Sequence, residues 1–141
     1  MKEYTFEEIE LGLTASFSKI ITEEDMASFL RLTGDLNPLH NDEKYAKSHN
    51  FKGRVVYGML ISSLLSTLAG VYLPGKNSLI LSVDTNFVKP SFIGDNIKIK
   101  GEVVDKKDFA NLIKVLYSIT NQNEEVISKG NMIVKVRDKN E

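Results

Sequence analysis

The sequence predicts an α+β fold in which a curved antiparallel sheet wraps around one central helix. A strand-like segment comes first, helical segments follow, and the second half of the chain consists of strand-like segments joined by short turns. Short turns join antiparallel neighbours, so this order argues against alternating βαβ units. One helical segment is apolar on nearly every side, and such a helix belongs in the interior of a protein.

The first strand and the first helix follow from local signals. Residues 14–21 have the composition of a strand. Thr22 then has the chemistry of an N-cap, and Asp25 follows it at the spacing of a capping box. Because Gly34 is a natural helix stop, we expect a helix between Thr22 and Gly34.

A loop and a short helix are expected next. Pro38 disfavours helical backbone in the residue before it, so residues 35–42 are expected to form a loop. A short helix then begins at Asn41 or Asp42 and ends at Ser48. An exposed connection leads from there into the apolar helix.

The apolar helix is expected over residues 59–69. No charged residue occurs between Arg54 and Lys76, a stretch long enough to raise the question of a membrane span. Glycine, serine and proline interrupt this stretch, and its apolar helical part is much shorter than the about 20 residues that a span requires. We therefore expect the helix to be enclosed by the protein's own core.

The second half of the chain has the periodicity of strands. Residues 96–105 alternate, with Ile97, Ile99 and Val103 on one face and charged residues mostly on the other. The last strand is expected to bend near Gly130. The expected strands cover residues 78–89, 96–105, 112–120 and 126–136.

Composition and charge limit the classes of function. The chain has 141 residues, of which 42% are hydrophobic, and this fits one domain over residues 1–141 with one core. It carries 18 Lys and Arg against 19 Asp and Glu, a formal net charge of −1 that argues against nucleic-acid binding. The absence of cysteine excludes disulfides and a cysteine nucleophile, and two histidines disfavour a histidine-rich metal site.

The amino-terminal segment and the single large helix bear on location and assembly. Glu3, Glu7, Glu8 and Glu10 interrupt any apolar segment, so we expect no signal peptide and a cytoplasmic location. Only one large helix covers the sheet, which leaves an edge or a face for a second subunit. We therefore expect a homodimer.

The most informative segment, GDLNPLH, concentrates an acid, an amide, a rigid proline and an imidazole. Asp35 and His40 can converge on one water molecule if the loop is bent, and Pro38 lowers the entropy of holding them there. Such a pair is a reasonable acid–base couple, because imidazole titrates near neutral pH. Asp-x-Asn-Pro is also ordinary turn chemistry, so the spacing alone leaves both interpretations open.

The start of the apolar helix is a second candidate site. A helix N-terminus presents unpaired N–H groups, and Gly58 lets a carbonyl oxygen approach one of them without a Cβ in the way. Equally, Gly58 can simply help the chain to turn into the helix. Ser62, Ser63, Ser66 and Thr67 interrupt the apolar helix, and their hydroxyls either bond to the preceding turn or hold a ligand. Neither a Gly-x-Ser-x-Gly elbow nor a glycine-rich phosphate loop is present.

The Asp-x-Asn-Pro-x-His block, followed at this spacing by Gly-Met-Leu, makes the chain recognisable. Together with ITEEDMASFLRLTG, LPGKNSLI and FVKPSFIGD, it resembles the MaoC-like hydratase family, and within it the single-domain (R)-specific enoyl-CoA hydratases. The resemblance covers about residues 5–136. It implies a hot-dog fold and a dimer that binds acyl-CoA at the shared interface.

The resemblance also implies a role for individual residues. It assigns catalysis to Asp35 and His40, loop shape to Asn37 and Pro38, the contact with the thioester oxygen to the backbone N–H of Gly58, and support of the catalytic residues to Ser66.

One position departs from the family. Tyr57 stands where the family commonly has histidine before the glycine, and tyrosine stays neutral near pH 7. We expect this change to alter pocket shape and substrate choice rather than to abolish hydration. Tyr57, Met59 and Lys89 are candidate substrate contacts, and Lys76 and Lys89 are candidates for the phosphates of coenzyme A.

The implied reaction is reversible addition of water to a trans-2-enoyl thioester, which gives the (R)-3-hydroxyacyl thioester. We expect no metal and no redox cofactor, and a thioester of coenzyme A or of acyl carrier protein as the substrate. An acyl-CoA thioesterase on the same fold and a non-catalytic acyl-thioester-binding module are the alternative interpretations. Release of free thiol would distinguish the thioesterase.

Overall fold

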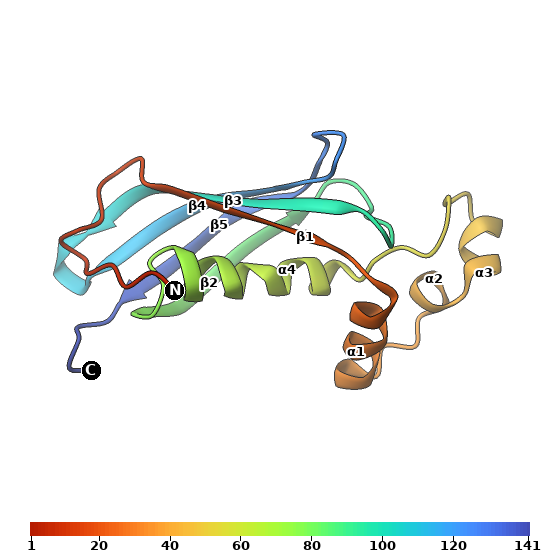
Figure 1. Ribbon diagram of the computed structural model, residues 1–141, viewed down its shortest axis with the longest axis horizontal. Helices are drawn as coiled ribbons and strands as arrows, with labels where there is room; N and C mark the ends of the chain where they lie inside the picture. Colours follow the sequence, from red (N-terminus) through yellow and green to blue (C-terminus); the bar gives the residue numbers. More distant parts are fainter.

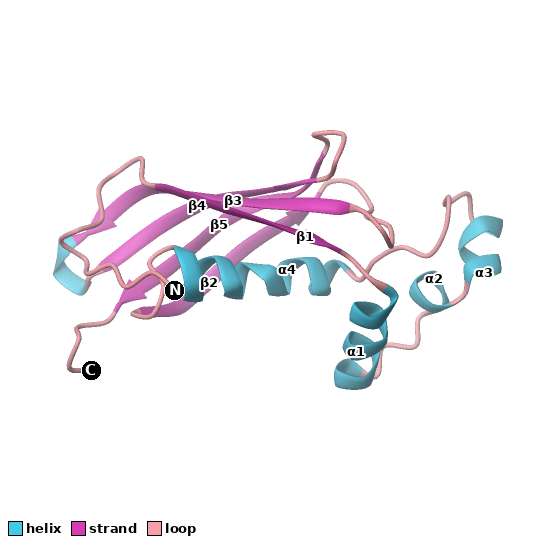
Figure 2. Ribbon diagram, viewed as in Figure 1, coloured by secondary structure: helices cyan, strands magenta, loops and turns pink.

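One sheet of five antiparallel strands and a central helix make up most of the computed structural model, which describes residues 1–141. The strands are ordered β1-β3-β4-β5-β2, so that β1 and β2 form the two edges (Figure 2). The elements in chain order are β1 Thr14–Ile20, α1 Glu23–Thr33, α2 Pro38–Asn41, α3 Glu43–Ser48, α4 Gly58–Thr67, η1 Leu68–Tyr72, β2 Ser78–Phe87, β3 Asn96–Lys107, η2 Asp108–Ala110, β4 Leu112–Thr120 and β5 Val126–Val136.

The sheet curves over α4, which lies along one of its faces (Figure 1). The short helices α1, α2 and α3 lie beyond the end of α4 at which that helix begins, and both chain termini lie toward the other end. This is the predicted hot-dog architecture. It places the first turn of α4 next to the segments that carry the predicted catalytic residues.

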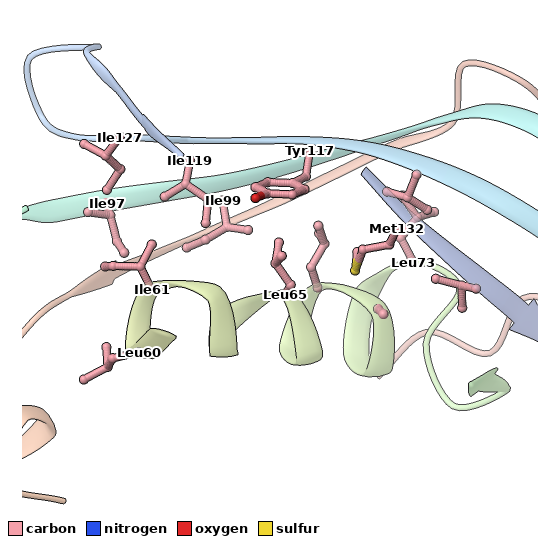
Figure 3. Packing of buried hydrophobic residues seen from close by; sticks show 14 of the residues in the cluster. Leu60, Ile61, Leu65, Leu73, Ile97, Ile99, Tyr117, Ile119, Ile127 and Met132 are labelled. Carbon is pink, nitrogen blue, oxygen red and sulfur yellow. The ribbon is translucent and has the colours of Figure 1, made fainter. Parts of the chain in front are cut away.

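The core lies between α4 and the sheet. Ile61 and Leu65 of α4 are buried and point toward the strands (Figure 3). The alternation predicted for β3 is confirmed, because Ile97 and Ile99 are fully buried whereas Lys98 and Lys100, which follow them, are exposed. Burial of each such aliphatic side chain stabilises the fold by about 1.5–3 kcal/mol.

The predicted ends of α1 are confirmed. The Thr22 hydroxyl accepts the Asp25 N–H at 3.1 Å, and the Asp25 carboxylate accepts the Thr22 N–H at 2.9 Å, which completes a capping box. Burial raises the pKa of Asp25, but these bonds and the Lys19 ammonium 3.0 Å away outweigh it, so the pKa is lowered. Gly34 ends the helix in the left-handed conformation with φ 71°.

The predicted loop after α1 contains one helical turn, α2. Proline excludes helix only before itself and is favourable at the first helical position, which Pro38 occupies. The Asn37 side chain caps this turn by accepting the Leu39 N–H at 3.0 Å. The turn therefore depends on the same Asn-Pro pair that predicted a loop.

The central helix is longer than predicted. It continues past Thr67 as the π-helical turn η1, so helical backbone extends to Tyr72 instead of ending at residue 69. None of the helices combines the length and the apolar composition that crossing a bilayer requires.

Gly130 lies in β5 at the point where a bend was predicted, and strand pairing continues through it without a register shift. It pairs with Thr85 of β2 and with Tyr117 of β4. A Cβ at this position would lie 1.9 Å from the carbonyl oxygen of Asp84. Glycine is therefore required here because two backbones approach each other closely.

Truncation of Leu65 to alanine is expected to destabilise the fold by about 2–5 kcal/mol, because it removes a fully enclosed side chain between α4 and the sheet. Urea unfolding measures the change. Leu32→Ala is the matched control, since Leu32 is 83% exposed and its truncation is expected to cost less than about 0.5 kcal/mol. Equal losses for the two variants would contradict the packing described here.

Candidate active site

The loop after α1 presents Asp35 in a turn held by its own side chain. The Asp35 carboxylate accepts the Asn37 N–H at 3.1 Å, and the Thr33 hydroxyl accepts the Asp35 N–H at 3.3 Å. Asp35 itself is exposed. Its carboxylate therefore has one partner within the chain and remains open to a water molecule or a substrate.

His40 is fixed by two contacts to the segment that leads into α4. Its Nδ1 lies 2.7 Å from the carbonyl oxygen of Val55, and its own carbonyl accepts the Nε–H of Arg54 at 2.7 Å. A carbonyl oxygen can only accept, so Nδ1 carries the proton. In the neutral ring, Nε2 then holds the lone pair and can take a proton from a bound water.

Tyr57 lies beneath both residues and is 1% exposed. Its hydroxyl lies 2.9 Å from the backbone carbonyl of Asp35 and 3.1 Å from the side-chain nitrogen of Asn41. Its ring packs against the imidazole of His40, with the ring centroids 4.3 Å apart, and against the ring of Phe29. Tyr57 was predicted as a substrate contact, but its hydroxyl is engaged within the protein.

Gly58 is the first residue of α4, and no hydrogen bond of the chain uses its N–H. A Cβ at this position would lie 3.0 Å from the ring of Phe87 on β2. The absence of a side chain therefore keeps both the N–H group and the space beside Phe87 open. This is the geometry that a polarised carbonyl needs.

A cavity of about 790 Å³ brings most of the predicted site residues together. Asp35, His40 and Gly58 all contribute to its wall, and Tyr57 and Met59 do as well. Its lining consists of Phe29, Thr33, Asp35, His40, Tyr57, Gly58, Met59, Ser62, Ser63, Val83, Thr85 and Phe87. The predicted acid, imidazole and helix N-terminus thus face one common space.

A smaller cavity of about 260 Å³ shares His40, Gly58 and Phe87 with the first. Lys89 lines it, and the Lys89 ammonium forms an ion pair with Glu125. The hydrogen bond from Lys89 lowers the pKa of the Glu125 carboxyl, and Asn121 adds to this effect. Lys89 is therefore near the site, with its charge already paired.

Four other predicted residues line neither of these two cavities. Asn37 and Pro38 shape α2 and line neither cavity, and Ser66 is exposed on α4 away from both. Lys76 follows η1, beyond the far end of the central helix from Gly58, and pairs with Glu3. Lys76 is therefore not part of the candidate active site.

Asn41 and Arg54 contact the site, and no role was predicted for either. The Asn41 amide donates to the Asn37 carbonyl at 3.0 Å and reaches the Tyr57 hydroxyl. Arg54 binds both oxygens of Glu23 at 2.8 Å in addition to the His40 carbonyl. The sequence offers one signal for Asn41, which lies one helical turn after Asn37, and none for Arg54.

No group of three or more His, Cys, Asp or Glu side chains lies close enough together to hold a metal ion. Ser62 is the one side chain with a buried polar atom that lacks a hydrogen-bond partner, and it lines the larger cavity.

The fold and this cavity together define a class: hot-dog domains whose central helix starts beside an aspartate–histidine loop. A family model described as "MaoC like domain" matches residues 6–125, and the chain belongs to this family.

Curated relatives carry hydratase and dehydratase names. The chain is 34% identical to the 3-hydroxybutyryl-CoA dehydratase of Methylorubrum extorquens, an alignment that covers 96% of this chain and 86% of that protein. It is also 34% identical to the (R)-specific enoyl-CoA hydratase of Aeromonas caviae, over 91% of this chain and 96% of that one.

Solved structures agree with this placement. The (R)-hydratase from A. caviae involved in PHA biosynthesis superposes with a TM-score of 0.87 at 34% identity, covering 91% of this chain and 97% of that one. An R-hydratase from Pseudomonas aeruginosa superposes with a TM-score of 0.90 at 30% identity, covering 96% and 86%.

Proposed function

We propose that this protein is an (R)-specific enoyl-CoA hydratase, a hydro-lyase that adds water reversibly to trans-2-enoyl thioesters and gives (R)-3-hydroxyacyl thioesters. The observation that carries the proposal is the single cavity in which Asp35, His40 and the first residue of α4 face one another. The hydratase and dehydratase names of the relatives support it, as do their identities of 34%.

The thioester carbonyl lies against the N–H of Gly58 in this mechanism. Addition of water to the β-carbon pushes negative charge onto the thioester oxygen. The unpaired N–H and the positive end of the α4 dipole stabilise that charge. One donor of this kind contributes about 3–4 kcal/mol to transition-state stabilisation.

Asp35 and His40 hold the water between them. As the water oxygen bonds to the β-carbon, one of its protons passes to Nε2 of His40 or to the Asp35 carboxylate, and the same pair returns a proton to the α-carbon. The Nδ1 bond to Val55 supports a basic Nε2 in this step. In these steps Asp35 and His40 transfer the protons, and the Gly58 N–H stabilises the charge on the thioester oxygen. The proposal therefore includes no metal or redox cofactor.

We also propose that two copies of the chain form a homodimer along the β2 edge. Val83 and Phe87 of β2 and Met59 of α4 line the larger cavity, yet they are 46%, 53% and 63% exposed. The outer edge of β2 is free to pair, and its exposed apolar side chains favour contact with a second subunit, which would cover this side of the cavity.

The substrate in this proposal is a thioester of coenzyme A or of acyl carrier protein. A cytoplasmic location stays a prediction.

Asp35→Asn and His40→Ala are expected to lower hydration of crotonyl-CoA by at least about 10²-fold each, because each removes one of the two groups that handle the water proton. Loss of enoyl absorbance measures turnover, and circular dichroism checks folding. Asp108→Asn and His49→Ala are matched controls at exposed positions outside the two cavities, and they are expected to keep wild-type rates.

Near wild-type turnover of either site variant would overturn the assignment of the pair. A thiol-capture assay on the same samples tests the reaction type. Stoichiometric release of free coenzyme A by the wild-type protein would indicate a thioesterase instead of a hydratase.

Gly58→Ala is expected to lower kcat/KM by about 10²-fold, because its methyl group would crowd Phe87 and shield the N–H from the thioester oxygen. Gly70→Ala is the matched control on the same helical segment, where a Cβ would meet only the Ser78 hydroxyl at 3.9 Å. Steady-state kinetics with crotonyl-CoA decide the comparison. Equal activity of the two variants would remove Gly58 from the proposed mechanism.

Val83→Glu is expected to turn the dimer into a monomer, because it places a charge on the exposed apolar edge of the sheet. Leu116→Glu is the control, since Leu116 on the interior strand β4 is 49% exposed. Sedimentation equilibrium measures the mass of each variant. A wild-type protein that sediments as a monomer would contradict the proposed assembly.

A further inference from the structure

Tyr57, the residue before Gly58, contacts the proposed catalytic groups although it takes no part in the proposed reaction. The Tyr57 side chain is buried, its hydroxyl bonds to the loop that carries Asp35, and its ring packs against His40 and Phe29. On the basis of the proposed function, we propose that Tyr57 is a positioning residue. It keeps the Asp35 carboxylate, the His40 imidazole and the Gly58 N–H in fixed positions relative to one another.

The hydroxyl of Tyr57 anchors the backbone of the catalytic loop. A phenol has one proton, and the shortest bond of this hydroxyl is 2.9 Å long and leads to the Asp35 carbonyl. Its oxygen then accepts from the Asn41 side chain at 3.1 Å, and the same amide nitrogen donates to the Asn37 carbonyl at 3.0 Å. The chain of bonds therefore fixes carbonyls on both sides of the turn that presents the Asp35 carboxylate.

The other hydrogen bonds of the Asp35 turn are local, to Thr33 and Asn37, whereas the Tyr57 hydroxyl ties the turn to the buried segment before α4. Asp35 is exposed, and its side chain has only the Asn37 N–H as a partner. Without the phenol, the Asp35 carbonyl keeps a single longer contact, to the Asn41 amide at 3.2 Å. A displacement of about 1 Å in a reacting group can cost as much as 10²-fold in rate.

The ring and the backbone of Tyr57 reach the other two groups. The ring stacks at a tilt of 33° on the imidazole of His40, whose Nδ1 is bound to Val55 two residues before Tyr57. The peptide bond that follows Tyr57 carries the N–H of Gly58. One residue thus sets the distance between the water site and the thioester oxygen site.

A direct substrate contact through the hydroxyl does not fit these observations. Tyr57 is 1% exposed, and its hydroxyl already has a donor and an acceptor within the protein. A positioning role affects the geometry of the reacting groups more than the binding of the thioester. It therefore lowers kcat and leaves KM nearly unchanged, whereas loss of a substrate contact raises KM.

The experiment compares Tyr57→Phe, Asn41→Ala and the double variant by steady-state kinetics with crotonyl-CoA. Tyr57→Phe keeps the ring on His40 and removes only the hydroxyl. We expect it to lower kcat about 10-fold with KM within about twofold of wild type. Because both residues act through one chain of hydrogen bonds, the double variant is expected to be no slower than Asn41→Ala alone.

Tyr45→Phe is the matched control, since Tyr45 is partly exposed on α3 and its ring stacks on His49 outside the two cavities. It is expected to keep wild-type kcat and KM. Thermal unfolding of each variant checks that the proteins are folded at the assay temperature. Should Tyr57→Phe fail to fold, Asn41→Ala alone tests the anchor by the same loss of kcat at constant KM.

Three results would overturn the proposal. The first is a wild-type kcat for folded Tyr57→Phe, or for Asn41→Ala if Tyr57→Phe does not fold. The second is a raised KM with unchanged kcat in the same variant, and the third is a double variant in which the two single losses of kcat multiply. Asp35→Asn and His40→Ala, measured alongside, separate this inference from the proposed function. If they lose turnover while Tyr57→Phe does not, only the positioning role fails. If they retain turnover, the proposed catalytic pair itself is wrong.

Discussion

The burial of α4 against the sheet is the constraint on which the rest of the structure depends. Ile61 and Leu65 pack under the strands, so the helix can neither slide nor rotate without exposing apolar surface. Its first residue, Gly58, is therefore held at the end where α1 and α2 lie (Figure 1). The packing of α4 therefore sets the position of the Gly58 N–H in the site.

The loop that faces this N–H is held mostly by backbone carbonyls that accept hydrogen bonds from side chains. Val55 accepts from His40, His40 accepts from Arg54, and Asp35 accepts from Tyr57. This arrangement leaves the Asp35 carboxylate and the second ring nitrogen of His40 open to the cavity. It also explains how a loop can hold the two proposed catalytic groups in place, since the loop is tied to the buried segment before α4.

Much of the architecture was predictable from local signals. The capping box of Thr22 and Asp25 and the alternation in β3 are confirmed, because these features depend on short-range hydrogen bonds and on the side-chain period of a strand. Other features depend on contacts between distant segments. Position 130 requires glycine because the Asp84 carbonyl approaches it from a neighbouring strand, a contact between residues far apart in sequence.

The sequence by itself determined the element order, the apolar central helix and the Asp-x-Asn-Pro-x-His block that identifies the family. Only the tertiary structure decided that the Tyr57 hydroxyl points to the loop and that Asn41 and Arg54 brace it. The physical reason is that periodicity and spacing report which face of an element is apolar. Contacts between two separate segments depend instead on how the whole chain packs.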